Sequence, residues 1–147
     1  MVKEPFLPSL RELARCYQAF EAHAAAHLRT LGLTSPQFDI IATLGNTPGM
    51  TSKELGEKTL ITKGTLTGVV DRLVSKGLVR RLAHDSDCRC QIVQLTKKGK
   101  RLFDKVFPAH LAYIGRAFKG FEAKDYARIE SSLRDLRAVF ESGGGQQ

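Results

Sequence analysis

The sequence predicts a mainly α-helical fold with a small two- or three-stranded β-wing, and three observations support that class. Apolar residues recur at alternating spacings of three and four through most of the chain, which is typical of amphipathic helices. Strand-like alternation is confined to two short runs between residues 78 and 95. The length of 147 residues suits one domain, or one domain with an extension, and is enough to bury a core.

The first third of the chain predicts two helices. The first carries one apolar stripe and ends at Gly32, since glycine is common just after a helix. Its stripe consists of Phe6, Leu10, Leu13, Tyr17, Phe20, Ala24 and Leu31. The second helix begins at Thr34-Ser35-Pro36, where a hydroxyl cap precedes a proline in the first turn, and a turn over residues 46–49 closes it.

Two further helices are predicted from their caps. Thr51 and Glu54 have the spacing of a capping box, and Gly56 in that short helix indicates another backbone too close for a side chain. Thr62 is expected to cap the next helix, over residues 63–76. Apolar residues at i, i+3, i+4 and i+7 form the buried stripe of that helix: Leu66, Val69, Val70 and Leu73.

The remaining elements are a hairpin and two more helices. Residues 78–82 and 91–95 predict two strands with a polar connection. Thr96 is expected to cap a helix that is kinked at Pro108, with Leu102, Val106, Leu111 and Ile114 facing inward. The last helix has a heptad seam made of Tyr126, Ile129, Leu133, Leu136 and Phe140. Residues 142–147 are expected to form a flexible tail.

Short helices followed by a two-stranded hairpin have the order of a winged helix-turn-helix. The second helix of that motif fits the major groove of DNA, and its outer side chains must be short and polar to reach base edges. The outer face of the helix over residues 63–76 has this character, and the alternative is a merely solvated face. The expected DNA contacts are Ser52, Lys53, Thr62, Lys63, Gly64, Thr65, Thr67, Arg72 and Arg89.

Two runs of the chain resemble the MarR (multiple-antibiotic-resistance regulator) family. They are LTSPQFDIIATLGNTPGMTSKELGEKTLITKGTLTGVVDRLVSKGLVRR and DCRCQIVQLTKKGKRLF. The most specific parts are Val70-Asp71-Arg72-Leu73, leading into Lys76-Gly77-Leu78-Val79, and Asp87-Cys88-Arg89, followed by Leu95-Thr96-Lys97-Lys98-Gly99. The likeness extends over roughly residues 7–141.

The resemblance implies a regulator, expected to be a repressor, that binds a near-palindromic operator in double-stranded DNA as a homodimer. It implies an N-terminal dimerisation helix (1–33), a winged helix-turn-helix lobe (34–100) and C-terminal dimerisation helices (101–141). A small-molecule effector that releases the DNA is a further expected partner.

The resemblance also assigns a role to one acidic residue. In some family members, the aspartate that matches Asp71 pairs with the arginine that matches Arg89 and braces the wing. The wing tip departs from the family's usual Asp-Pro-x-Asp-Arg-Arg, because His84-Asp85-Ser86-Asp87-Cys88-Arg89 lacks the proline and one arginine. Without that proline and that arginine, the sequence does not predict the family's usual wing rigidity or the whole of its DNA contact.

Composition restricts the class of function and the location. The 23 Lys and Arg against 15 Asp and Glu give a net charge of +8, which favours a polyanionic partner. No apolar run approaches the roughly 18 residues that span a membrane, so no membrane partner is expected. Three cysteines and the lack of a secretory signal indicate the cytoplasm. No enzyme motif is present, so we expect no catalytic residue and no cofactor.

Two alternative functions stay open: a thiol-based peroxide-sensing repressor of the same family, and a winged helix that binds protein and not DNA. Cys16, beside Tyr17 on the first helix, matches a peroxide-sensing thiol in one branch of the family, whereas a small buried hydrophobe is the plainer interpretation. A winged helix that binds protein and not DNA would show an apolar recognition face, and this face is polar and basic.

Clusters of metal-ligating residue types do not reach the pattern of a metal site. His84, Cys88 and Cys90 are too few and too closely spaced for structural zinc. His23 and His27 lie one helical turn apart without a nearby carboxylate or thiol, which favours a polar pair. We therefore expect no bound metal.

Overall fold

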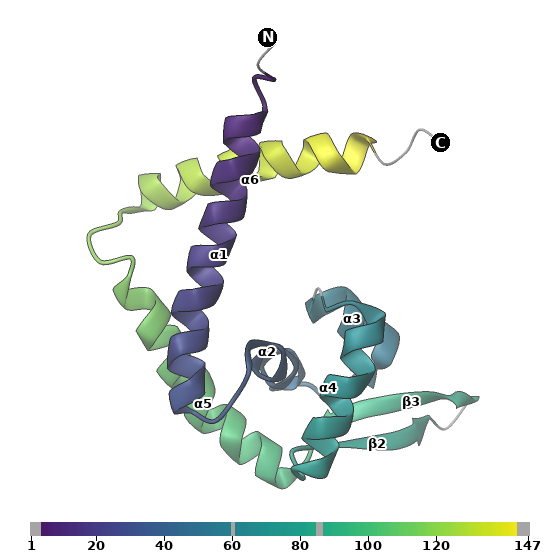
Figure 1. Cartoon of the computed structure of the whole chain (residues 1–147). Coiled ribbons are helices and arrows are strands. Elements are labelled where there is room, and N and C mark those ends of the chain that lie inside the picture. Colours follow the sequence, from purple (N-terminus) through teal and green to yellow (C-terminus); the bar gives the residue numbers. More distant parts are fainter. Residues whose placement is uncertain (1–3, 60, 85–86, 144–147) are drawn as a thin grey trace. The chain divides into compact units, whose positions relative to one another are not determined.

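The computed structural model describes residues 4–59, 61–84 and 87–143, with only the backbone described at 84 and 87–89 (Figure 1). Six helices and three strands lie in these ranges, which confirms the mainly helical prediction with a β-wing. In chain order they are α1 (Leu7–Thr30), α2 (Ser35–Leu44), β1 (Met50–Thr51), α3 (Ser52–Thr59), α4 (Lys63–Ser75), β2 (Val79–His84), β3 (Asp87–Leu95), α5 (Lys97–Arg116) and α6 (Ala123–Gly143).

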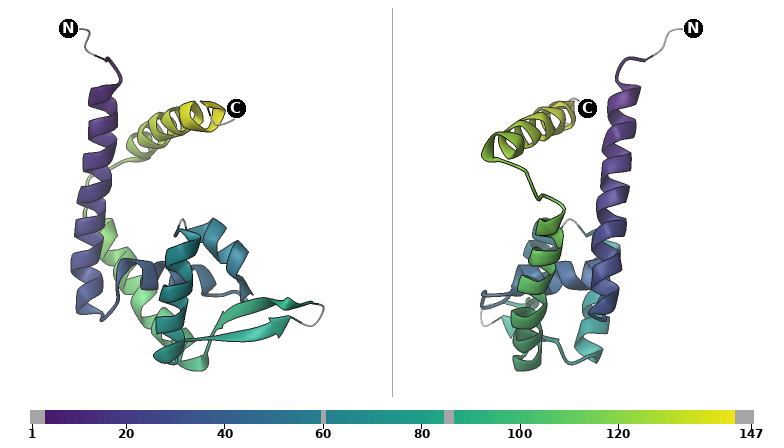
Figure 2. Two further views of the ribbon diagram at one scale, coloured as in Figure 1. Left: turned by 45° about the vertical axis from the view of Figure 1, so that its right-hand side comes forward. Right: turned by 90° about the vertical axis from the view of Figure 1, so that its left-hand side faces the viewer.

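The chain forms two compact units, which divide between Tyr113 and Ile114. The first unit holds α1 to α4, the sheet and most of α5 (Figure 2). The second unit holds the end of α5 and all of α6. The expected tail begins inside α6, which extends to Gly143, and its residues 144–147 lie outside the described residues.

The wing is a three-stranded antiparallel sheet in the order β1-β3-β2. Val79 pairs with Leu95, and Met50 pairs with Val93 on the other edge of β3. Gly49 makes the second pairing possible, because its φ is +105° and a Cβ there would lie 2.8 Å from the Val93 carbonyl oxygen. Both long strands extend toward the tip beyond the predicted 78–82 and 91–95.

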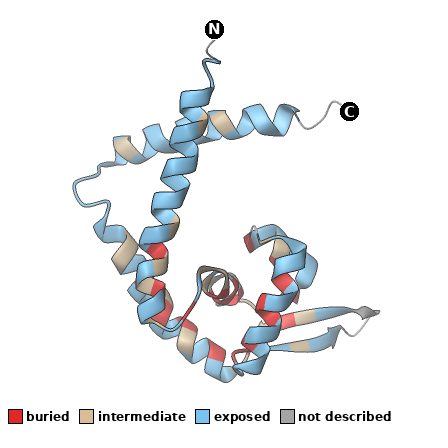
Figure 3. Ribbon diagram, in the orientation of Figure 1, coloured by how far each residue is buried: buried red, intermediate tan, exposed pale blue. Residues whose placement is uncertain are grey.

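The hydrophobic core lies within the first unit, between α2, α3, α4 and the sheet (Figure 3). All four residues of the predicted α4 stripe are buried, as are Ile40, Ile41 and Leu44 of α2. Phe103 and Val106 of α5 complete the core from the other side. The fully apolar side of α4 therefore faces inward and holds the opposite, polar side toward solvent.

Three of the predicted helix starts are confirmed by hydrogen bonds. The Thr34 hydroxyl accepts from the Gln37 amide at 3.3 Å, and the Gln37 side chain accepts from the Thr34 amide at 3.1 Å. Thr51 and Glu54 exchange the same two bonds at 3.2 and 3.3 Å. The Thr96 hydroxyl accepts from the amide three residues further on, at 3.1 Å. Each pattern satisfies backbone donors that a helix start leaves unpaired.

Two sequence expectations about packing are wrong. A Cβ at Gly56 would meet only the Leu66 side chain, at an ordinary contact distance of 3.5 Å, so no backbone lies close. Leu111 is exposed, whereas His110 on the neighbouring position of α5 is buried. Helix α5 continues through Pro108, and the inward face beyond it turns toward α1 and α2 and contains histidine instead of leucine.

The end of α4 is bonded to the start of α5. The Thr96 amide donates to the Leu78 carbonyl at 3.0 Å, and the Thr96 hydroxyl donates to the Gly77 carbonyl at 2.6 Å. The Lys98 ammonium donates to the Lys76 carbonyl at 3.0 Å. A lysine at this place also offsets the negative end of the α4 dipole.

Gly99 lets these two helix ends approach. It is buried in the first turn of α5, and a Cβ built on it would overlap the Leu78 carbonyl oxygen. Any larger residue at this position would force α5 away from the turn that ends α4.

Candidate nucleic-acid interface

The polar face of α4 is open to solvent and uncovered by the rest of the described chain. Every predicted contact on it is exposed, namely Lys63, Gly64, Thr65, Thr67 and Arg72. A Cβ at either Gly64 or Gly68 would meet no atom within 4 Å. The face therefore has short side chains and free space above its backbone, which is the shape that base edges in a major groove require.

The start of α4 differs from the prediction at Thr62. Its side chain makes no capping bond to the backbone, and its hydroxyl donates instead to the Thr65 hydroxyl at 3.1 Å. Thr62 is therefore the N-cap residue by position, as predicted, but its side chain does not cap the helix. Because a helix leaves its first amides without intrahelical partners, the start of α4 offers N–H donors to an external anion such as a phosphate.

Ser52 and Lys53, the two predicted contacts outside α4 and the wing, lie exposed in the first turn of α3. Helix α3 packs on α4 through buried Leu55, so both helices present their starts from one rigid lobe. Both predicted contacts are therefore open to solvent beside the start of α4.

Asp71 is bonded to a residue that the sequence did not single out. Its Oδ1 accepts from Arg81 Nη2 at 2.6 Å, a charge-assisted bond from α4 to β2. The predicted partner, Arg89, has its side chain outside the described residues, so that pairing stays a prediction. Neutralisation of Asp71 by Arg81 explains how a carboxylate can lie on a face suited to DNA.

The base of the wing is tied to the loop that precedes β1. Arg80 Nε donates to the Gln94 side-chain oxygen at 2.6 Å, and Gln94 Nε2 donates to the Pro48 carbonyl at 3.1 Å. These bonds cross from β2 to β3 and on to the turn after α2. Together with the Asp71 pair, they fix the direction of the wing relative to α4.

A second polar cluster lies between α1 and α5. His27 Nδ1 and His110 Nδ1 are 2.9 Å apart, so one ring must donate to the other, and Tyr113 stacks on His27 with ring centroids 4.3 Å apart. Burial lowers the pKa of His110, and the charges of His27 and His23 lower it further. The sequence predicted only His23 and His27 as a pair, because His110 and Tyr113 come from a helix far along the chain.

The described residues also bear on metal binding, on the cysteines and on membrane insertion. Within 4–59, 61–84 and 87–143, no three His, Cys, Asp or Glu side chains are grouped closely enough to hold a metal ion. Within one chain Cys16 is exposed and not buried as the sequence favoured, and Cys88 has its side chain outside the described residues. No helix in the described ranges has both the length and the apolar character to cross a membrane.

Comparisons with known proteins agree with this geometry. The model of the MarR family matches residues 33–91. The chain is similar to the HTH-type transcriptional regulator MhqR of Bacillus subtilis, with 33% identity over 102 residues that make up 69% of this chain and 70% of the relative.

Solved structures share the fold over nearly the whole chain. AbsC, a MarR family transcriptional regulator from Streptomyces coelicolor, has a TM-score of 0.83 at 23% identity and covers 97% of this chain and 98% of its own. A mutant of MarR from Escherichia coli, complexed with operator DNA, has a TM-score of 0.80 at 26% identity and covers 91% and 99%. Both the MhqR relative and the AbsC structure are transcriptional regulators by name. With an open polar helix beside a braced wing, they show that the chain belongs to the MarR family of DNA-binding transcriptional regulators.

Proposed function

We propose that the protein is a homodimeric repressor that binds a near-palindromic operator with the α4 helix of each subunit in the major groove. The observation that carries the proposal is the open polar face of α4, where Gly64 and Gly68 leave the backbone uncovered. The surplus of eight positive charges adds a general attraction to DNA.

Two kinds of contact follow from the positions of the side chains. Thr65 and Thr67 are exposed on the first half of α4 and are assigned to base edges. The Thr65 hydroxyl accepts from Thr62, which leaves its own hydrogen to donate to a base. Lys53, Lys63 and Arg72 are assigned to phosphates, which bind cations without regard to sequence. Ser52 joins them at the start of α3, and Arg89 is assigned to the wing contact, in keeping with the family resemblance.

Dimerisation is supported by apolar side chains that one chain leaves in water. On α1, Tyr17 is 62% exposed and Phe20 is 51% exposed. Within the second unit, Leu133 is 52% exposed and Phe140 is 55% exposed, and α6 buries none of its residues. Isolated soluble chains rarely expose so many large apolar groups together, so we assign residues 1–33 and 101–141 to the dimer. Each dimer then presents two α4 helices about one DNA turn apart, 10–10.5 bp.

The names of the relatives favour repression over activation. The homoprotocatechuate degradative operon repressor of Escherichia coli is 31% identical over 108 residues, which make up 74% of this chain and 70% of the relative. A dimer on a promoter excludes RNA polymerase, and this would take place in the cytoplasm. The fold also accommodates effectors, since PcaV of Streptomyces coelicolor, with a TM-score of 0.76 at 23% identity, was solved with its natural ligand. We propose release by such a small molecule.

The test begins with selection of bound fragments from the source genome, which gives the operator. Affinity for the operator and for a scrambled duplex is then titrated against salt for Thr65→Ala, Thr67→Ala and Arg72→Ala. The threonine variants should lose about 1–3 kcal/mol of preference for the operator where a good base contact is removed. Arg72→Ala should weaken both duplexes and flatten the salt dependence by about one unit of slope per subunit.

Lys100→Ala is the matched control, because Lys100 is exposed on α5 and lies outside the predicted DNA contacts and the residues assigned to the dimer. This variant should leave the preference for the operator over the scrambled duplex unchanged. It should alter the salt dependence of affinity by much less than one unit of slope per subunit. Equal loss on both duplexes for the threonine variants would refute their assignment to bases. Absence of any operator preference in the wild type would contradict sequence-specific regulation and favour a winged helix that binds protein.

A further inference from the structure

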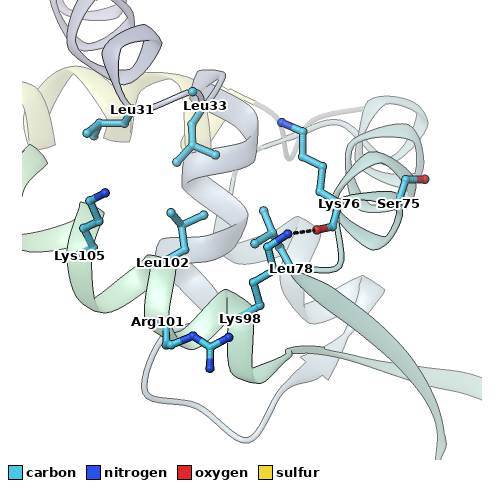
Figure 4. A pocket seen from close by; sticks show the side chains of 10 residues that line it. Leu31, Leu33, Ser75, Lys76, Leu78, Lys98, Arg101, Leu102 and Lys105 are labelled. Atoms are coloured by element: carbon cyan, nitrogen blue, oxygen red, sulfur yellow. Dashed lines mark hydrogen bonds between the residues drawn. The ribbon is translucent and has the colours of Figure 1, made fainter.

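A cleft of about 630 Å³ lies where the end of α1, the end of α4 and the first turns of α5 meet (Figure 4). All of its lining residues belong to the first compact unit: Leu31, Gly32, Leu33, Ser75, Lys76, Leu78, Lys98, Arg101, Leu102 and Lys105. Leu33 and Leu78 are buried and form an apolar floor, with Leu31 and Leu102 half-buried beside them. The volume is within the ordinary range of small-molecule sites.

Four cations surround this floor and no acid is among the lining residues. In the part of the chain that the structure describes, none of Lys76, Lys98, Arg101 and Lys105 forms an ion pair. Lys98 is the one with a side-chain hydrogen bond there, to the Lys76 carbonyl. All four are exposed, so water and salt weaken the attraction of each, but together their uncompensated positive charge favours an anion in the cleft.

We propose that this cleft binds a small organic dianion with an apolar body, either a phosphate monoester or a dicarboxylate. One negative charge would leave most of the four cations uncompensated, which favours a ligand with at least two. The leucine floor favours a ring or a branched chain over a bare inorganic ion. A DNA phosphodiester has one charge per group and no apolar body, so it fits the cleft less well.

The cleft adjoins the end of α4, the helix that is proposed to enter the major groove. Ser75 and Lys76 end α4, and the Lys98 ammonium that holds the Lys76 carbonyl also lines the cleft. A dianion there competes for that ammonium and so acts on the anchor of α4. This consequence rests on the proposed function, whereas binding of the dianion itself does not.

The test uses full-length protein without DNA, and isothermal titration with four probes at pH 8. Phenyl phosphate and phthalate are the dianions, benzoate supplies the ring with one charge, and inorganic phosphate supplies the charge without a ring. Phenyl phosphate or phthalate should saturate one site per chain at least tenfold more tightly than benzoate or inorganic phosphate. Which of the two binds more tightly distinguishes the phosphate monoester from the dicarboxylate.

Variants assign the binding to the cleft. Arg101→Gln and Lys105→Gln should each weaken the better dianion about tenfold, whereas Lys100→Gln, an exposed lysine of α5 outside the lining, should not. Arg101→Lys retains the charge and should restore most of the affinity. Thermal melting of each variant shows whether the fold is retained.

Several outcomes would overturn the proposal. Equal binding of benzoate would refute the need for two charges, and equal binding of inorganic phosphate would refute the role of the leucine floor. Absence of binding by every probe would refute the site. If Arg101→Gln and Lys105→Gln weaken operator binding when no probe is present, the cleft is a DNA contact instead. Failure of the regulator function itself would show only in wild-type DNA titrations.

Discussion

The pair between Asp71 and Arg81 allows the wing brace to be tested by a double-mutant cycle. The variants are Asp71→Ala, Arg81→Ala and the double variant. The two charged atoms are 2.6 Å apart, with the Asp71 side chain 59% exposed and the Arg81 side chain 28% exposed. Exposed ion pairs contribute about 0.2–1 kcal/mol, and the short bond with a partly buried guanidinium places this pair near the upper end, at about 1 kcal/mol.

Two effects of Asp71→Ala on DNA binding oppose each other. Removal of a carboxylate from a DNA-facing helix reduces repulsion of phosphate, and salt screens that gain. Loss of the brace frees β2 and the wing relative to α4, which lowers the fraction of molecules ready to bind. We expect the second effect to prevail at 0.15 M salt, so that operator affinity falls by about fivefold, the equivalent of about 1 kcal/mol.

The assay combines urea unfolding with fluorescence anisotropy on labelled operator. Glu57→Ala is the charge-matched control, because Glu57 is an exposed carboxylate on α3, outside the residues assigned to the dimer. Coupling of about 1 kcal/mol in stability, with weaker operator binding only for the brace variants, is the expected result. Additive single effects, or tighter binding of all DNA by Asp71→Ala as by Glu57→Ala, would refute the brace. Arg89→Ala in the same cycle tests the pairing that the family resemblance implies.

Three further predictions concern the dimer, the thiols and the histidine cluster. Leu133→Asp combined with Leu136→Asp should give a monomer or an unfolded chain by sedimentation, since Leu133 is exposed and Leu136 only half-buried within one chain; a well-folded dimer would contradict the assignment of the last helix. Replacement of all three cysteines by Ser should leave operator affinity within a few fold, and mild peroxide should not release the wild type; release that vanishes in Cys16→Ser would establish a thiol sensor. The lowered pKa of His110 means that the unfolded chain binds a proton more readily than the folded one, so unfolding free energy should fall as the pH drops through the ordinary value of 6.5 and level off below the folded pKa. His110→Asn should lessen that fall in urea titrations, and an unchanged pH profile would contradict it.

Local sequence patterns predicted the helices and the exposed polar face of α4 well. The buried stripe of α4 and the caps at Thr34, Thr51 and Thr96 depend on residues three to seven apart, and the structure contains each of them. The two-residue strand β1 is too short for any periodicity to reveal. It forms because β3 supplies a pairing edge, which only the folded chain brings there.

The features that the sequence missed depend on contacts across the chain. Arg81 is one of two adjacent arginines on β2, and nothing local indicates which of them faces Asp71. His110 joins His27 across 83 residues. Thr62 has the residue type of a cap, yet its hydroxyl donates to the Thr65 hydroxyl and its oxygen accepts no backbone amide.

The bonds that join the end of α4 to the start of α5 couple the two helices, so that a rotation of one is passed to the other. Helix α5 has 20 residues, so it is about 30 Å long. A rotation of about 5° at the Thr96 junction moves its far end by about 2.6 Å, at 1.5 Å of rise per residue. In the proposed dimer on DNA, a shift that small at the far end of α5 would therefore turn α4 by several degrees. The length of α5 sets the ratio between the two motions. Inserting one helical turn into α5 should therefore change how far α4 rotates, without altering the side chains on α4 that are proposed to contact bases.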